Sequence, residues 1–172
     1  MSLNRGVAAL GAVALVGVAT LGVSYGIASS AGQPIPKVSV TSGSTWTQFS
    51  PASTCYNGGD PLTAKQLAAC GALIQKQANN ATAPAISVAP NGTFMISVDK
   101  KLTEKGWTAS GGQTSLVSET KNYQASNLPV SSVIAAASST SAAATSGTVL
   151  VLEQQGKTIY GAWLFQLNQK SA

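Results

Sequence analysis

The chain has 172 residues, which is enough for one domain of ordinary size after an N-terminal targeting segment is set aside. Its formal net charge is +5, but the lysines are scattered along the chain and Arg5 is its only arginine, so nucleic-acid binding is not expected. The chain has no histidine, and its five carboxylates are widely spaced in the sequence: Asp60, Asp99, Glu104, Glu119 and Glu153. These features predict a protein that is not an enzyme and that has no catalytic residue, metal site or cofactor.

The N-terminal segment contains a long apolar run, from Val7 to Ile27, that carries no charged residue. At a rise of about 1.5 Å per residue, a helix of this length just crosses a hydrocarbon core of about 30 Å. A cleaved export signal has an apolar centre of only about 7 to 15 residues, so the run favours a retained transmembrane anchor over residues 1–28. The alternative is cleavage, because the small residues Ala28–Ala31 match a signal-peptidase site.

The charges that flank this run predict its orientation. Arg5 precedes the run and Lys37 is the first charged residue after it. The N-terminus is therefore expected in the cytoplasm, and the rest of the chain on the extracytoplasmic side of the plasma membrane. Residues 29–36, rich in Ser, Ala, Gly and Pro, are expected to form a linker, and residues 37–172 the extracytoplasmic domain.

Small residues recur along the predicted anchor at intervals of four. Gly22 and Gly26 form a GxxxG pattern, and Ala8 and Ala12 have the same spacing. Residues four apart share one face of a helix, so this pattern predicts a surface on which a neighbouring membrane helix packs closely. The competing interpretation is that export signals rich in alanine and glycine contain such patterns by chance.

The first elements expected in the domain are two strands and a helix. Lys37–Val40 and Thr45–Phe49 have strand composition and are separated by a Ser-Gly-Ser turn. A helix is predicted to start at Pro61 and to extend beyond Cys70. Cys55 and Cys70 are the only two cysteines, and in an exported domain they predict one disulfide that closes a loop of about 15 residues.

The next expected strands are Ala85–Val88 and Thr93–Val98, on either side of Asn91-Gly92, and the second of them alternates between apolar and polar residues. Phe94, Ile96 and Val98 share one face by this alternation and are predicted to lie in the core. Residues 99–107 follow as a polar corner, whose mixed charges indicate a solvated surface, with a docking patch as the alternative.

Further strands are predicted at Thr114–Ser118 and Val130–Ile134, and the low-complexity residues 135–147 are expected to form a loop. The last element is a hairpin of Thr148–Gln154 and Thr158–Asn168. In its second strand, the face predicted to be the more buried is that of Trp163, Phe165 and Leu167.

Short strands at spacings of roughly ten residues predict a mainly β fold. The expected architecture is an antiparallel, Ig-like β-sandwich with a short helical insert, preceded by one N-terminal transmembrane helix. The disulfide differs from that of a true immunoglobulin domain, which joins the two sheets across a much longer stretch of chain. Trp46, Trp107 and Trp163 are expected to lie in the core or at its edge.

Two cysteines, the run AISVAPNGTFMISVDKKLTEKGW and the final YGAWLFQL occur in this order between Lys37 and Leu167. In these features the chain resembles an uncharacterised family of actinobacterial exported or membrane-anchored proteins, in which many members have a proline in place of Asp99. It is also similar to small anchored accessory proteins of the cytochrome bcc-aa3 supercomplex of corynebacteria and mycobacteria. Those proteins place a helix beside the large subunits and a small domain on the outer face.

The resemblance and the small-residue helix faces together predict a non-enzymatic, single-pass accessory subunit that stabilises a larger membrane complex. The expected partners are larger integral membrane subunits, with the respiratory bcc-aa3 supercomplex as the suspected complex, and membrane lipid. The sequence leaves one alternative open, a secreted or tethered module that binds a component of the cell envelope.

Overall fold

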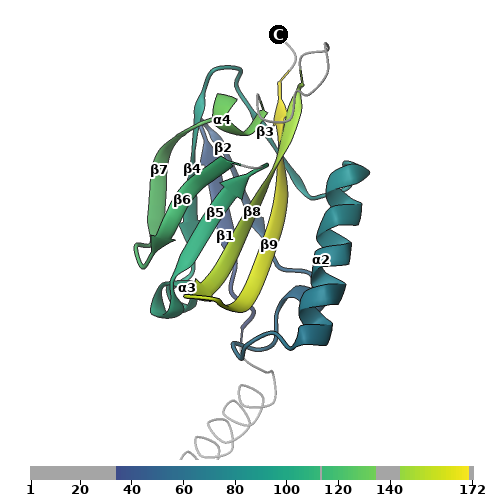
Figure 1. Cartoon of the computed structure of the whole chain (residues 1–172). Coiled ribbons are helices and arrows are strands. Elements are labelled where there is room, and N and C mark those ends of the chain that lie inside the picture. The colour runs from purple at the N-terminus through teal and green to yellow at the C-terminus, as the bar shows by residue number, and fades with distance from the viewer. Residues whose placement is uncertain (1–33, 113, 135–143, 171–172) are drawn as a thin grey trace, which may run out of the picture. The chain divides into compact units, whose positions relative to one another are not determined.

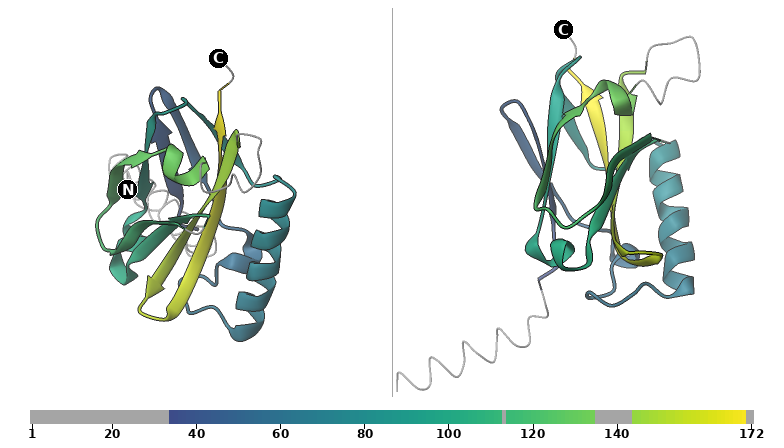
Figure 2. Two further views of the ribbon diagram at one scale, coloured as in Figure 1. Left: turned by 45° about the horizontal axis from the view of Figure 1, so that its top comes forward. Right: turned by 60° about the vertical axis from the view of Figure 1, so that its left-hand side comes forward.

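The computed structural model of the chain describes residues 34–112, 114–134 and 144–170. From Ile35 onward these residues belong to one mainly β unit, with two sheets and few helices (Figure 1). The two sheets lie face to face, and helix α2 lies outside them, beside strand β9 (Figures 1 and 2).

The first sheet is antiparallel throughout and has the strand order β2-β1-β4-β7. The predicted hairpin at its edge is confirmed, with β1 at Val38–Ser42 and β2 at Thr45–Phe49. Gly43 in the turn has a φ of +57°, a conformation that glycine adopts without steric cost. The other two strands are β4 (Thr93–Val98) and β7 (Gln124–Pro129).

The second sheet has the order β3-β9-β8-β5-β6. The predicted C-terminal hairpin is confirmed as its centre, formed by β8 and β9, but the expectation of an all-antiparallel fold is wrong because β3 pairs with β9 in parallel. The α2 connection precedes β3 and carries the chain along the sheet in the direction of β9, so β3 continues in that direction (Figure 1). The five strands are β3 (Ala85–Val88), β5 (Trp107–Gly111), β6 (Thr114–Thr120), β8 (Ser146–Gln155) and β9 (Thr158–Gln169).

One hydrophobic core fills the space between the two sheets. The rings of Phe49 and Phe165 stack across it with their centroids 4.8 Å apart, which brings β2 against β9. The faces predicted from strand alternation are buried as expected: Phe94, Ile96 and Val98 on β4, and Trp163, Phe165 and Leu167 on β9.

Two of the three tryptophans are core residues. Trp107 and Trp163 are fully buried, as predicted, but Trp46 is 59% exposed and the prediction for it is wrong. Strand β2 directs Phe49 into the core, and alternation then places Trp46 on the outer face together with Gln48.

The short helices differ most from the sequence-based prediction. The strand predicted at Val130–Ile134 is wrong, because this segment forms the helical turn α4 (Ser131–Ile134). Val130, Val133 and Ile134 are all buried, and their spacing of three and four residues is helical. The polar corner at residues 99–107 contains a second short helix, α3 (Lys100–Lys105), which buries Leu102 in the core between the two sheets.

Helix α2 (Ala64–Asn79) extends beyond Cys70 as predicted, but it begins after Pro61 rather than at it. Thr63 and Gln66 form a capping box, in which the Gln66 N–H donates to the Thr63 hydroxyl at 3.3 Å and the Thr63 N–H donates to Gln66 Oε1 at 3.0 Å. These bonds satisfy two backbone N–H groups that the helix itself cannot pair, so the cap sets the start of the helix.

Candidate functional site

Folding gathers the scattered charged residues at one end of the domain, called the lower end after its place in Figure 1. Trp107, which directly follows α3, pairs with Thr120 at the end of β6 and with Glu153 near the end of β8. The β6–β7 connection and the β8–β9 turn therefore lie beside α3. All five carboxylates and seven of the nine lysines belong to this end: Lys37, Lys65, Lys100, Lys101, Lys105, Lys121 and Lys157.

Two of these assignments depend on a loop rather than on strand register. Asp60 and Lys65 flank Leu62, whose backbone N–H donates to the carbonyl of Ile159 at 2.9 Å. Ile159 lies next to the β8–β9 turn, so the start of α2 belongs to the lower end as well. The other two lysines lie elsewhere, Lys76 on the last turns of α2 and Lys170 after β9.

The chain leaves its N-terminal segment and joins both sheets at the lower end. The indole N–H of Trp163 donates to the Pro36 carbonyl at 3.1 Å, in a buried hydrogen bond to the second sheet. The Lys37 backbone N–H donates to Asp99 Oδ2 at 2.6 Å, beside the end of β4 in the first sheet. The point where the domain begins is therefore held on both sides, by a buried hydrogen bond to Trp163 of the second sheet and by an exposed one to Asp99 beside the first.

The hydrogen bond between Trp163 and Pro36 can be tested by substitution. Trp163→Phe removes the indole donor and leaves the buried Pro36 carbonyl unpaired, which we expect to lower the unfolding free energy by about 1–3 kcal/mol. It should also increase hydrogen exchange at Ile35 and Lys37. Trp107→Phe is the matched control, because Trp107 is equally buried and donates to the Asn122 carbonyl at 2.7 Å.

Both variants should destabilise the domain, but only Trp163→Phe should raise exchange at the N-terminal junction, as measured by hydrogen–deuterium exchange. Equal exchange at Ile35 and Lys37 in the two variants would mean that the bond to Pro36 does not hold this segment.

Glu153 is the one carboxyl buried inside this end, with only 3% of its surface exposed. It shares the inner face of β8 with Val149 and Val151, so its side chain points between the sheets. Its Oε2 atom has no hydrogen-bond partner among the described residues. The residue opposite it on β9 is Gly161, where a Cβ would lie 2.7 Å from the Trp163 ring, so no side chain can fill that position.

Burial raises the pKa of the Glu153 carboxyl to about 7. The ammonium of Lys105 opposes this rise, the carboxylate of Glu104 adds to it, and the ammonium of Lys101 opposes it. Burial also raises the pKa of Tyr56, and the charge of Glu153 adds to that effect. Lys105 Nζ lies 4.9 Å from the centroid of the Tyr160 ring. The ammonium that most opposes the rise in the Glu153 pKa is therefore held against an aromatic ring of β9.

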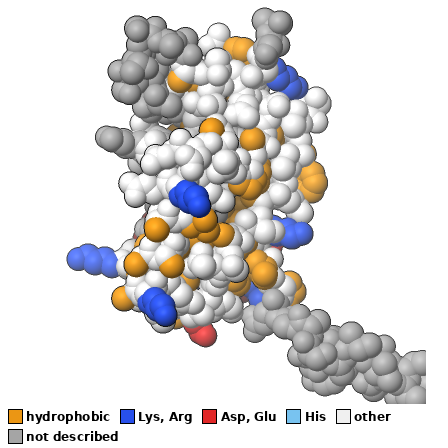
Figure 3. Space-filling view, turned by 90° about the vertical axis from the view of Figure 1, so that its right-hand side faces the viewer, with side chains coloured by type: hydrophobic (Ala, Val, Ile, Leu, Met, Phe, Trp, Pro, Cys, Tyr) orange, Lys and Arg blue, Asp and Glu red, His pale blue; other side chains and the backbone are white. Residues whose placement is uncertain are grey.

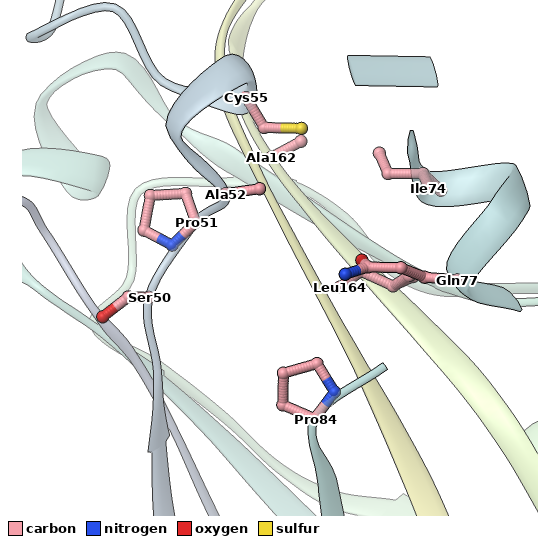
Figure 4. Close-up of a pocket in the computed structure, with 9 residues that line it drawn as sticks. All are labelled: Ser50, Pro51, Ala52, Cys55, Ile74, Gln77, Pro84, Ala162 and Leu164. Atoms are coloured by element: carbon pink, nitrogen blue, oxygen red, sulfur yellow. The ribbon is translucent and has the colours of Figure 1, made fainter. Parts of the chain in front are cut away.

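The domain also has a cavity of about 130 Å³, which is separate from these carboxylates (Figure 4). It lies between η1 (Ser53–Cys55), α2 and the outer face of β9. None of the five carboxylates lines it, and Ser50 and Gln77 are its only polar side chains apart from the disulfide. The lining residues are Ser50, Pro51, Ala52, Cys55, Ile74, Gln77, Pro84, Ala162 and Leu164.

The cavity persists under α2 because the helix contacts the sheet along a narrow strip. Cys70 is the only buried residue of α2, and it forms a disulfide with Cys55 at a Cα–Cα distance of 5.0 Å. Leu73 and Ile74 are half-buried beside it, over Ala162 of β9. The predicted disulfide is thus present, and it attaches α2 to η1. The face that carries α2 is largely uncharged, with isolated lysines and scattered apolar side chains (Figure 3).

The chemistry available within the described residues is limited. No group of three or more Asp, Glu or Cys side chains there has the arrangement of a metal site. Glu153 is a titratable carboxyl, but it is buried in the core and is not among the residues that line the cavity beneath α2. The prediction that the protein is not an enzyme stays a prediction.

The predicted helix-packing residues Ala8, Ala12, Gly22 and Gly26 lie outside the described residues, as does the predicted anchor over 1–28. Within residues 34–112, 114–134 and 144–170, no helix has the length and apolar character needed to cross a membrane. The chain matches no protein-family model, no curated protein and no solved structure. The resemblance to actinobacterial anchored proteins therefore also stays a prediction.

The sequence-based prediction does not identify Glu153 as buried, although the alternation of residues in its strand indicates this. In the run from Val149 to Glu153 every second residue faces the core, and the carboxyl falls on the apolar face of that alternation. A charged residue at such a position indicates a buried titratable group, which the wide spacing of the carboxylates in the sequence does not reveal.

Proposed function

We propose that the chain is a non-enzymatic, single-pass accessory subunit of a larger membrane complex, with the bcc-aa3 respiratory supercomplex as the first candidate. The observation that carries the proposal is the junction at Pro36 and Lys37. An uncharged run long enough to cross a bilayer leads, through a short linker, to a point that is fixed into both sheets. Such a junction suits a domain held at a membrane surface.

The disulfide supports the extracytoplasmic side of this proposal. Disulfides form and persist in oxidising compartments outside the cytoplasm, and Cys55–Cys70 closes a local loop that carries α2. We accordingly propose the orientation with the N-terminus in the cytoplasm, the domain outside, and residues 1–28 as a transmembrane helix.

We also propose that the domain is an Ig-like β-sandwich. The two sheets share one core and α2 lies outside them as an insert, which supports an Ig-like β-sandwich as the architecture of the domain. The parallel pair β3–β9 and the local disulfide both distinguish it from a true immunoglobulin domain.

The partner-binding surface proposed for the helix is the face of Gly22 and Gly26. Leucine at both positions should prevent close approach of a neighbouring helix, and we expect it to lower recovery of the partner by roughly tenfold. The test is purification of the tagged full chain in mild detergent, followed by mass spectrometry. The outer domain should keep its disulfide and its thermal unfolding in the variant.

The matched control is Thr20→Leu with Ser24→Leu, which adds the same two side chains on the opposite face of the helix. It should leave partner recovery unchanged. Recovery of the wild-type chain alone and monomeric would count against the accessory-subunit proposal.

The second candidate function is a secreted or tethered module that binds a cell-envelope component. The cavity beneath α2 favours it, because it is a concave, mostly apolar site with Ser50 and Gln77 as polar groups. A free chain in the culture medium that begins at Gly32 would support this function over the first.

A further inference from the structure

We infer that the lower end of the domain is a docking surface for anionic phospholipid headgroups. The domain would then lie on the membrane that its N-terminal segment crosses, rather than stand away from it. The inference rests on the proposed function, because the predicted anchor is what brings the two surfaces together.

The first support is the distribution of lysines. They are scattered in sequence, yet folding places seven of nine at the lower end, where they outnumber the carboxylates by two. Lys37, Lys100, Lys121 and Lys157 are exposed and come from four separate segments, so the positive groups are spread around this end rather than along one strand. Glu153 is buried inside, which leaves four carboxylates at the surface.

Those four carboxylates reduce the positive electrostatic potential of the lower end but do not cancel it. One oxygen of Asp99 accepts the Lys37 backbone N–H, while the Lys37 side chain remains exposed. The opposite end of the domain contains the β1–β2, β3–β4 and β5–β6 turns, and the described residues of these turns include no charged side chain. Most of the charged groups therefore lie on the side from which the chain emerges, while Lys170, whose backbone N–H donates to the Val88 carbonyl at 2.9 Å, lies at the opposite end.

The second support is apolar surface at the same end. The described residues include four large hydrophobic side chains that are exposed, and two of them, Ile35 at 55% and Tyr123 at 60%, lie at the lower end. The Tyr123 carbonyl accepts the Val98 N–H at 2.9 Å, so the residue is fixed beside the start of α3. Tyrosine is enriched where a protein meets the headgroup region, because its ring is apolar and its hydroxyl is polar.

The third support is the short length of the predicted linker. The linker at residues 29–36 extends at most about 28 Å, so a membrane-anchored domain stays within that distance of the headgroups. At physiological ionic strength the Debye length is only about 8 Å, and lysines attract anionic lipid within that range. A short linker that leads into the lysine-rich end keeps this end, rather than the opposite end, near the bilayer.

The test uses the full chain in nanodiscs that contain phosphatidylglycerol, compared with nanodiscs of phosphatidylcholine alone. Each lysine is labelled with an amine-reactive reagent, and its rate is followed by mass spectrometry. We expect Lys121 and Lys157 to react about threefold more slowly in the anionic discs. Lys76 and Lys170, away from the lower end, are internal controls that should react equally in both. The protection should disappear at about 1 M salt, where the Debye length is about 3 Å.

A charge-reversal variant makes the test independent of labelling chemistry at those two lysines. Lys121→Glu with Lys157→Glu should abolish the lipid-dependent protection of Lys100, whereas the matched variant Lys76→Glu with Lys170→Glu should retain it. Equal labelling rates in the two lipids, or protection that is the same in both and insensitive to salt, would overturn the inference while leaving the anchor intact. A chain that does not enter the discs at all would refute the anchor, and the inference with it.

Discussion

Glu153→Gln is expected to stabilise the domain by about 3 kcal/mol at pH 8 and to change its stability little near pH 4.5. Burial raises the pKa of this carboxyl from 4.5 to about 7, and a tenfold change in proton affinity corresponds to about 1.4 kcal/mol. The folded state holds the proton more tightly than the unfolded state does, so the contribution of Glu153 is most favourable below pH 4.5 and is lost as the pH rises through 7. Glutamine resembles the protonated carboxyl at every pH and removes this loss.

The measurement is urea-induced unfolding of both chains at pH 5 and pH 8, followed by the fluorescence of the buried tryptophans. The wild-type chain should lose stability between the two pH values by an amount that the variant does not. Glu119→Gln, which removes an exposed carboxyl from the same end of the domain, should behave like the wild type. An identical pH dependence in wild type and Glu153→Gln would show that the carboxyl is solvated rather than buried.

Replacement of both cysteines by alanine is the second change with a large expected effect. A disulfide across a loop of about 15 residues stabilises a fold by roughly 3 kcal/mol on the chain-entropy model. For a domain of this size such a loss lowers Tm by roughly 10 °C. The effect should be concentrated in α2, because Cys70 is its only buried residue and isolated helices of this length are marginal in water.

Hydrogen–deuterium exchange separates this local effect from general destabilisation. Without the disulfide, the amides of α2 should exchange far faster, while those of β8 and β9 at the centre of the second sheet keep their protection. Reduction of the wild-type chain should reproduce the pattern. Full protection of α2 in the double-alanine chain would mean that Leu73 and Ile74 hold the helix without the covalent bond.

The parts of the fold that are predictable from the sequence are those whose signal is local. Alternation of apolar and polar residues identifies β4 and β9 together with their buried faces, because a strand with one face in the core must repeat every two residues. The Thr158–Asn168 prediction differs from β9 by a single residue at its end.

The parts that are not predictable depend on contacts between distant segments. Strand β7 (Gln124–Pro129) buries only Leu128, so it has no alternation to detect, and it exists because β4 pairs with it along a sheet edge. The parallel pairing of β3 with β9 joins Ala85 to Gln166, which no local pattern can indicate. Residue type alone predicts a core position for Trp46, whereas the register set by Phe49 places it outside.

The charged lower end is likewise predictable only in part. Each lysine and carboxylate is visible in the sequence, but their common location follows from topology, since the β6–β7 connection, the β8–β9 turn and α3 come together only when both sheets have formed. The residues predicted to contact a partner, Gly22 and Gly26, lie outside the described residues and rest on the sequence pattern.

The state of the N-terminus tests the central claim, a retained anchor that holds this domain at the membrane, most directly. The chain would be isolated separately from washed membranes and from culture medium, and its intact mass and N-terminal peptide measured by mass spectrometry. We predict that the chain is found in the membranes with residues 2–28 still attached. A mature chain that begins at Gly32 and is found in the medium would contradict the claim.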